Sequence, residues 1–490
     1  MSRRIVAVLA GLSLASTAFA AEETKPAYET QIHAPQEKSA VRKELVQVTP
    51  GGLTADQAAA RAIESSLAVQ QQQQAVAEAA ARVDEAFYSF FPRISTNARY
   101  TRLSSLTPPA LGGGSLVATT APPGTPNPTP TVAFALSFPV FLNQASIGAG
   151  IAIPLSDYAL RISKANEAAS NARAAAQLNE LAAKAKAQSD ARIGFYNWLR
   201  TLGAVTVTEQ TLADRRTHLA DAKLLFAAGT VSNVDVLRAE ADVTGGEQQL
   251  ARARSLSRLA ERSLKLLLQL PSEDRLAPGE PLTAPVQPAV GEVRTFTQRA
   301  RDSRPELKSI DETLKALAQQ KAITRAGNYP SLYANADALL ANPNPRVQPA
   351  TKQEWVPTWS AGLLLTWSPN DLLVSNQQIH GQQARIAQLE SQRAQLADGL
   401  DLETTSAFED LSQAQFAIDA STKQLGAAEE AFRVTQVLYR EGRALQTTLE
   451  DVETQVTLAR LSLLNAHADL HVARVKLDHA TGDDTLQIKR

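Results

Sequence analysis

The chain has 490 residues and a formal net charge of −1, with 20% charged and 5% aromatic residues. This balance gives no indication of nucleic-acid binding, and the absence of cysteine excludes disulfides and thiolate-ligated metal sites. The many alanine, leucine, glutamine and charged residues, with few aromatics, favour long helices over compact sandwiches.

The first twenty residues have the pattern of a secretory signal peptide. Arg3 and Arg4 precede an apolar run over 5–14, and a small-x-small cleavage site ends at Ala20. We expect export, with an extended leader over 21–52; a short membrane anchor is the alternative. No later window reaches the roughly 18–20 consecutive apolar residues of a spanning helix. A membrane crossing by the mature chain would therefore require a closed β-barrel.

The remaining sequence contains two copies of one unit, over 53–270 and 293–482, joined by a proline-rich linker over 271–292. The residues before Gly229 match those before Gly442 at an offset of 213 (442 minus 229). Apolar and small residues repeat every seven positions on both sides of this match. Such self-similarity at a fixed offset indicates tandem duplication.

Two further matches show where the copies differ. The segment after Pro92 matches that after Pro330 at an offset of 238, whereas Gly150 matches Gly362 at an offset of 212. The first copy therefore holds 26 extra residues (238 minus 212) between these points. They fall in a long loop rich in proline and glycine, over 103–145.

Each unit begins with a predicted helix that ends before a proline, over 54–88 and 293–327. Apolar and polar residues then alternate, as they do in strands with one apolar and one polar face. Four such segments are predicted: 93–101, 146–155, 332–340 and 357–368.

Three of the four tryptophans lie in or beside the last predicted strand: Trp355, Trp359 and Trp367. Aromatic residues at the ends of apolar strands are typical of the girdles of outer-membrane barrels. The alternative is a soluble sandwich with buried tryptophans.

Two proline-free segments, 157–228 and 371–441, predict helices of about 70 residues and about 105 Å. A glycine turn follows each helix, and returning helices over 233–270 and 446–481 complete two hairpins. Their tips lie at 229–235 and 442–448, and a short tail follows over 483–490. The seven-residue spacing predicts a left-handed supercoil. A soluble coiled coil is the alternative interpretation.

Four strands cannot close a barrel, because the smallest outer-membrane barrels have about eight. Open strand edges are not tolerated in lipid, so closure would need several copies related by rotational symmetry. Two copies would supply eight strands and three would supply twelve. Both numbers of copies satisfy the requirement for a closed barrel.

In their order and spacing, the two units resemble the TolC-like outer-membrane efflux family, whose members are the outer-membrane factors of tripartite efflux and type I secretion systems. The resemblance implies a mainly α fold with membrane β-strands. It implies a homotrimer with a 12-stranded β-barrel, a periplasmic α-barrel and an equatorial belt near the linker. The function it implies is a passive exit duct in the outer membrane of a Gram-negative bacterium. Its partners would be outer-membrane lipid, a periplasmic adaptor and an inner-membrane pump. We expect no enzymatic activity, no cofactor and no nucleic-acid partner.

The resemblance also assigns roles to the tips. Family members carry acidic residues six and nine positions after the second tip glycine, where this chain has Thr448 and Asp451. One carboxylate of the expected aperture is thus missing, and Glu450 would compensate only if it faced inward. In the family, an aspartate after the first tip restrains the closed state by bonding a tyrosine and an arginine near the second tip. Asp235 and Tyr439 match the aspartate and the tyrosine, but the arginine is displaced by one position, to Arg443. The expected adaptor-binding residues are Phe226, Gly229, Val231, Ser232, Tyr439, Gly442, Ala444 and Leu445.

No catalytic motif, phosphate loop or zinc signature is recognisable. His467 and His471 are four residues apart on a predicted helix, and with Asp478 they have the spacing of a metal site. Solvent-exposed helix histidines are the simpler interpretation, so we predict no metal. A periplasmic adaptor or a structural coiled-coil envelope protein are the alternative functions.

Overall fold

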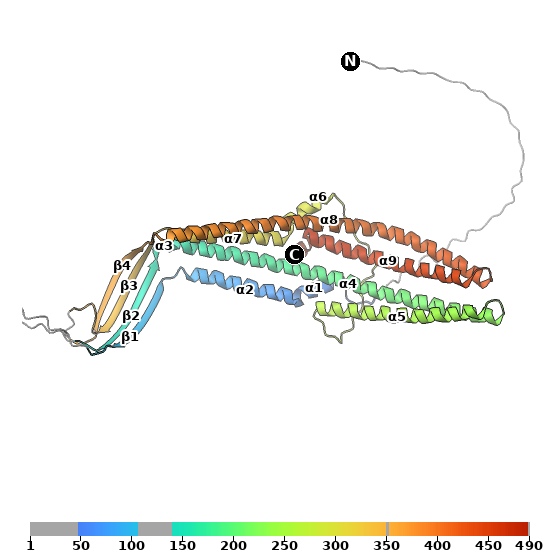
Figure 1. Cartoon of the computed structure of the whole chain (residues 1–490), viewed down its shortest axis with the longest axis horizontal. Helices are drawn as coiled ribbons and strands as arrows, with labels where there is room; N and C mark the ends of the chain where they lie inside the picture. Colours follow the sequence, from blue (N-terminus) through green and yellow to red (C-terminus); the bar gives the residue numbers. More distant parts are fainter. Residues whose placement is uncertain (1–47, 106–139, 349–351, 489–490) are drawn as a thin grey trace, which may run out of the picture. The chain divides into compact units, whose positions relative to one another are not determined.

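The computed structural model describes residues 48–105, 140–348 and 352–488. The predicted signal peptide, the leader up to residue 47 and the centre of the loop over 103–145 lie outside the described residues. The described residues belong to one unit. Figure 1 labels its helices and strands.

The four predicted strands form one antiparallel sheet in the order β1-β2-β3-β4 (Figure 1). Their bounds lie within a few residues of the prediction; β2 begins three residues earlier and β3 ends two residues later. The strands are β1 (Arg93–Arg102), β2 (Asn143–Pro154), β3 (Ser331–Asn342) and β4 (Val356–Thr366). Within the described chain, β1 and β4 are the edge strands and each has only one partner.

The register places most of the large apolar residues of the four strands on one face. Ile94 pairs with Ile151, which pairs with Ala336, which pairs with Ala361. The opposite face carries polar residues and glycines, for example Asn97 opposite Gly148. Because side chains alternate across a strand, this registration builds one continuous apolar face and one polar face. The alternation predicted from the sequence is confirmed.

Two antiparallel helix pairs follow the strands, as predicted (Figure 1). The longest helices have 65 and 70 residues and span about 100 Å. The first is preceded by a short helix α3 (Leu155–Asp157) and a π-helical turn, η1 (Tyr158–Ile162). The pairs are α4 (Ser163–Ala227) with α5 (Asn233–Leu267), and α8 (Asp371–Arg440) with α9 (Gln446–Thr481).

The helix that opens each unit is broken in two, which the prediction missed. Ser66 and Arg304 have extended backbone conformations at the two breaks. Arg304 precedes Pro305, and a residue before proline is disfavoured in the helical region. The resulting helices are α1 (Ala55–Ser65), α2 (Leu67–Tyr88), α6 (Val293–Ser303) and α7 (Pro305–Ala326). A last helix, α10 (Asp483–Ile488), occupies the predicted tail.

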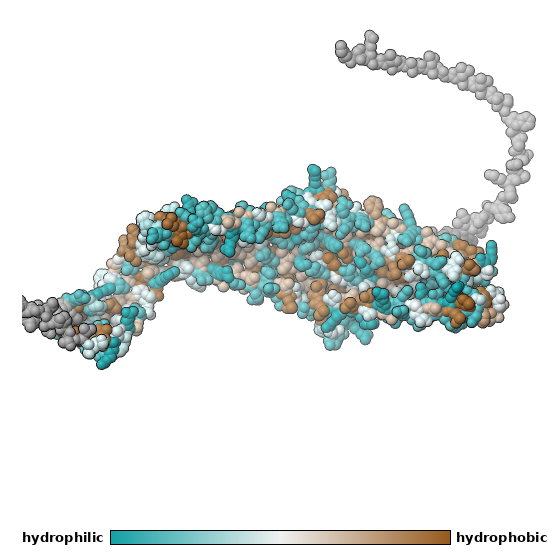
Figure 2. Space-filling model, viewed as in Figure 1, coloured by the Kyte–Doolittle hydropathy of each residue, from teal (hydrophilic) through white to brown (hydrophobic). Residues whose placement is uncertain are grey.

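The largest buried cluster lies near the middle of α4, where Phe195, Trp198 and Leu199 are almost inaccessible to solvent. Leu282 of the linker joins this cluster, so the proline-rich segment packs against the helices. Elsewhere on the helices the core consists largely of alanine and leucine, which lets neighbouring helices approach closely. Figure 2 shows apolar residues scattered among polar ones along the helices of the face in view.

No helix in the described part of the chain combines the length and the apolar character of a membrane-spanning helix.

Candidate functional site

Both hairpins turn on a glycine in the left-handed conformation. Gly229 has φ +75° and Gly442 has φ +69°, values that residues with a Cβ rarely adopt. The same bond closes each helix: Thr230 N donates to Leu225 O at 3.0 Å, and Arg443 N donates to Leu438 O at 2.8 Å. The two tips therefore share one Schellman-type cap, as expected from a duplicated unit.

The surface of the tips is largely exposed and partly apolar. Phe226 is exposed on the first hairpin, and Leu445 is 73% exposed on the second. Gly229, Ser232 and Gly442 are also exposed, whereas the predicted tip residues Val231 and Ala444 are partly covered. Tyr439 differs from the other predicted contact residues because it is buried at 3% exposure.

Within the described chain, Asp235, Tyr439 and Arg443 are not bonded to one another across the tips. Asp235 instead caps its own helix, accepting from Ser232 N at 3.0 Å and Ser232 Oγ at 2.8 Å. Arg443 forms an ion pair with Glu441 at 3.4 Å. The buried Tyr439 hydroxyl has no hydrogen-bond partner among the described residues. Burial and then the charge of Asp235 raise the pKa of Tyr439.

The acidic residues after the second tip face different surroundings. Asp451 and Thr448 are exposed. Glu450 is partly covered and faces Asp242 of α5 and the side-chain amide of Gln446. Burial and the proximity of Asp242 raise the pKa of Glu450, while the bond from Gln446 opposes this shift. Glu450 thus lies in the contact between the two hairpins, which does not favour a second free carboxylate at this level.

A buried ionic contact joins the hairpins further from the tips. His218 Nδ1 of α4 lies 3.0 Å from Glu453 Oε2 of α9, and Arg215 Nε donates to Glu453 Oε1 at 3.3 Å. The side chains of His218 and Glu453 are 5% and 9% exposed. This link could not be predicted from the sequence, because neither His218 nor Glu453 belongs to a recognisable motif.

His471, the second histidine of the α9 pair, makes its contacts within the fold. His471 is 7% exposed, so the interpretation of an exposed histidine was wrong. Its Nε2 lies 3.0 Å from Leu282 O, and its ring stacks on Tyr196 with 4.4 Å between centroids. Asp478 bonds to Arg474 at 2.8 Å. Within the described ranges, no group of three or more ligating side chains is arranged for a metal ion.

The tryptophans beside and in β4 are exposed, with Trp359 at 79% exposure. Trp355 and Trp367 are about half exposed. A sandwich with buried tryptophans is therefore not what this chain forms. A wide apolar sheet face rimmed by aromatic residues requires cover by lipid or by another apolar surface.

Comparisons with solved structures identify the fold. The outer-membrane channel OprN shares 17% identity, covers 94% of this chain and 98% of its own, and gives a TM-score of 0.70. CusC, whose structures describe transmembrane channel formation, shares 15% identity over 90% of this chain and 95% of its own, with a TM-score of 0.72. The Campylobacter jejuni CmeC outer membrane channel shares 12% identity over 97% of both chains, with a TM-score of 0.69.

No curated protein matches the sequence. The sequence profile of outer membrane efflux proteins, however, matches residues 58–268 and 296–483. These segments make up most of the chain, and each includes one strand pair and one helix hairpin. The duplication seen in the sequence and in the fold is the duplication of this family. The chain belongs to the outer membrane efflux protein family.

Proposed function

We propose that three copies of this chain form a passive exit duct through the outer membrane, fed by an inner-membrane pump through a periplasmic adaptor. The observation that carries the proposal is the four-stranded sheet. It has one continuous apolar face and two edge strands without outer partners among the described residues.

Edge-to-edge pairing between copies gives both edge strands a partner and turns the apolar faces of all copies to the same side. Pairing β1 of one copy with β4 of the next removes every open edge, and rotational symmetry lets the ring close. Three copies supply twelve strands, which is the arrangement implied by the family resemblance. The apolar face would then contact lipid and the polar face would line the lumen.

The two helix pairs supply the length of the duct below the membrane. Helices of 65 and 70 residues extend about 100 Å from the sheet to the glycine tips. We assign the adaptor contact to the tips, where exposed apolar residues such as Phe226 and Leu445 are available for docking. Energy for transport would come from the pump, because the chain contains no recognisable nucleotide-binding motif.

Asp451 is our candidate for the aperture. It is exposed near the second tip, and a threefold axis would place three copies of its carboxylate in one ring. Thr448 offers no charge, so we expect a single acidic ring and only moderate cation preference at this level.

Disulfide trapping would test the assembly, because the chain has no cysteine of its own. One cysteine at Asn97 in β1 would be combined in turn with a cysteine at each of positions 358–364 in β4. We expect covalent trimers for the register-matched pair, and none when the second cysteine is at Ala338 of the inner strand β3.

Planar-bilayer recording of the purified protein would test the duct itself. We expect trimer-dependent conductance, with a reduced cation preference in the Asp451→Ala variant. A protein that stayed monomeric and soluble without detergent would contradict the proposal. Equal ion preference in the two proteins would remove Asp451 from the aperture.

A further inference from the structure

The turn after β3 folds over the polar face of the sheet. Ala341 of that face is 1% exposed and Asn344 of the turn is 2% exposed. The Asn344 side chain donates to Val356 O at 2.7 Å and to Thr358 Oγ1 at 3.1 Å. These bonds hold the turn over 343–348 against the start of β4, on the side of the sheet that we assign to the lumen.

An ion pair fixes the same turn further along the face. Arg346 Nη2 lies 2.5 Å from Asp337 Oδ2 of β3, and it also donates to Ser360 Oγ of β4 at 3.1 Å. Ser360 in turn donates to Asp337 Oδ1 at 2.5 Å. The charge of Arg346 is thus neutralised within the sheet, and the turn has a defined position.

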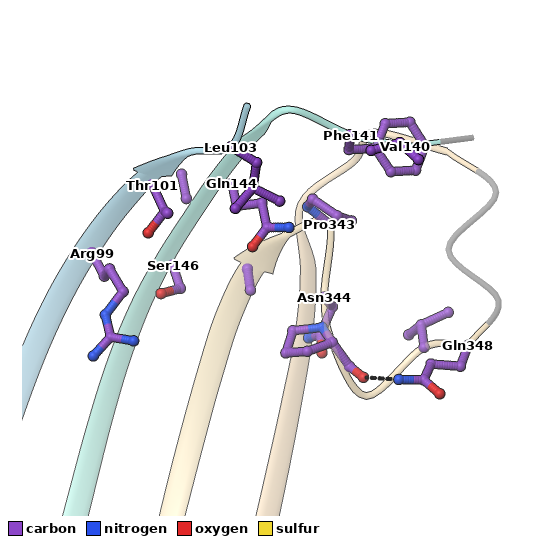
Figure 3. A pocket seen from close by; sticks show the side chains of 14 residues that line it. Arg99, Thr101, Leu103, Val140, Phe141, Gln144, Ser146, Pro343, Asn344 and Gln348 are labelled. Carbon is purple, nitrogen blue, oxygen red and sulfur yellow. Dashed lines mark hydrogen bonds between the residues drawn. The ribbon is translucent and has the colours of Figure 1, made fainter. Parts of the chain in front are cut away.

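A cavity of about 800 Å³ lies between this turn and the strands β1 and β2 (Figure 3). Arg99, Thr101 and Ser146 line its strand side, and Asn344 and Gln348 lie on the turn (Figure 3). Its volume falls within the range of about 300–1,000 Å³ found for small-molecule sites.

One charge dominates this cavity. Arg99 is the only ionisable residue among its described lining residues. It forms no ion pair within the described ranges, in contrast to Arg346. Phe141, Val140 and Leu103 add apolar surface at the rim. A cationic group beside apolar walls is complementary to an organic anion with an apolar body.

We propose that this cavity is a transient binding site for amphiphilic organic anions on their way out of the duct. Arg99 would pair with the anionic group, and the rim around Phe141 would contact the apolar body. The inference rests on the proposed function, because the polar face borders the transported solutes only in a closed ring of copies. It narrows that function by naming a class of cargo that would bind in the duct beside the turn over 343–348.

The test uses the full chain in detergent and two probes of nearly equal shape, 2-naphthoate and the neutral 2-naphthylmethanol. Their fluorescence would be titrated with the wild type and with Arg99→Gln. We expect saturable naphthoate binding that weakens at least tenfold in the variant. Naphthylmethanol should bind weakly and equally to both proteins.

Two further variants separate charge from damage to the fold. Arg102→Gln is the matched control. Arg102 lies on the same strand, but it belongs to the opposite face of the sheet and donates to Asn143 Oδ1 at 3.3 Å. We expect its naphthoate affinity to stay within twofold of the wild type. Arg99→Lys keeps the charge and should retain affinity within a few-fold. Equal affinity of the wild type and Arg99→Gln, or no saturable binding at all, would overturn the proposal.

Recording naphthoate block of single-channel current distinguishes this failure from that of the duct. Channels that conduct but show no Arg99-dependent block would refute the anion site and leave the duct intact. Arg99-dependent binding by a protein that forms no channels would refute the duct, and with it the role of this cavity in transport.

Discussion

Lowering the pH should destabilise the region where the linker crosses α9, through the single residue His471. Its ring is enclosed by Tyr196 of α4, by the linker carbonyl of Leu282 and by its neighbour His467. Burial lowers the pKa of His471 from 6.5 to about 4, and the nearby His467 adds to the effect. The bond to Leu282 O opposes it. The histidine is therefore neutral in the folded chain at neutral pH.

The sign and size of the effect follow from linkage. In the unfolded chain this histidine protonates below pH 6.5, whereas in the folded chain it stays neutral until about pH 4. The unfolded state thus binds more protons in this window, so stability is present above pH 6.5 and is lost as the pH falls toward 4. A pKa difference of this size lowers the free energy of unfolding by about 3 kcal/mol when the loss is complete, and by about 2 kcal/mol at pH 5.

Thermal unfolding of the wild type and His471→Gln at pH 7.5 and pH 5.0 would measure this effect. Glutamine can still donate a bond to Leu282 O but does not titrate. We expect the wild type to lose several degrees more than the variant on acidification. The exposed His380 of α8 supplies the control, since His380→Gln should follow the wild type. If His471→Gln lost as much stability as the wild type, burial of a neutral histidine would not be the cause.

Three further substitutions probe other contacts. Glu453→Ala leaves the buried His218 without its hydrogen-bond partner and should cost about 1–3 kcal/mol, seen as a lower unfolding temperature. Gly442→Ala places a Cβ on a residue at φ +69°, and no atom lies within 4 Å to contact it. The strained backbone should lower the free energy of unfolding by about 1–2 kcal/mol, detected as faster proteolysis at the second tip. A Cβ at Gly148 would lie 2.6 Å from Asn97 Oδ1, so Gly148→Val should reduce the yield of assembled protein in gel filtration, and adding Asn97→Ala should restore it.

Much of the fold could be predicted from local patterns. Alternation over 93–101 fixed the two faces of β1, because side chains on a strand point to opposite sides. The absence of proline over 371–441 predicted the long α8, which extends from Asp371 to Arg440. The positions of Gly229 and Gly442 predicted the turns, because the left-handed conformation favours residues without a Cβ.

The site was only partly predictable. The sequence predicted the glycine turns of the tips, and the aperture role of Asp451 stays a prediction. Asp235 matched the family's restraint between the tips only in part, and it caps α5 in the structure. A carboxylate three residues after an N-cap serine accepts hydrogen bonds from that serine at the start of the helix. This local contact forms without any residue from the other hairpin. The prediction that His471 is exposed was wrong, because Leu282 of the linker that covers it lies 189 residues earlier in the chain.

The sequence by itself therefore determined what depends on neighbours along the chain: the duplication, the helix lengths, the turns and the alternation of the strands. Tertiary structure alone decided what depends on residues distant in sequence. It buried His471 beneath the linker, paired His218 with Glu453 and folded the turn with Arg346 onto Asp337. The physical reason is that periodicity fixes which face a side chain occupies, whereas its partner on that face is chosen only when separate elements pack together.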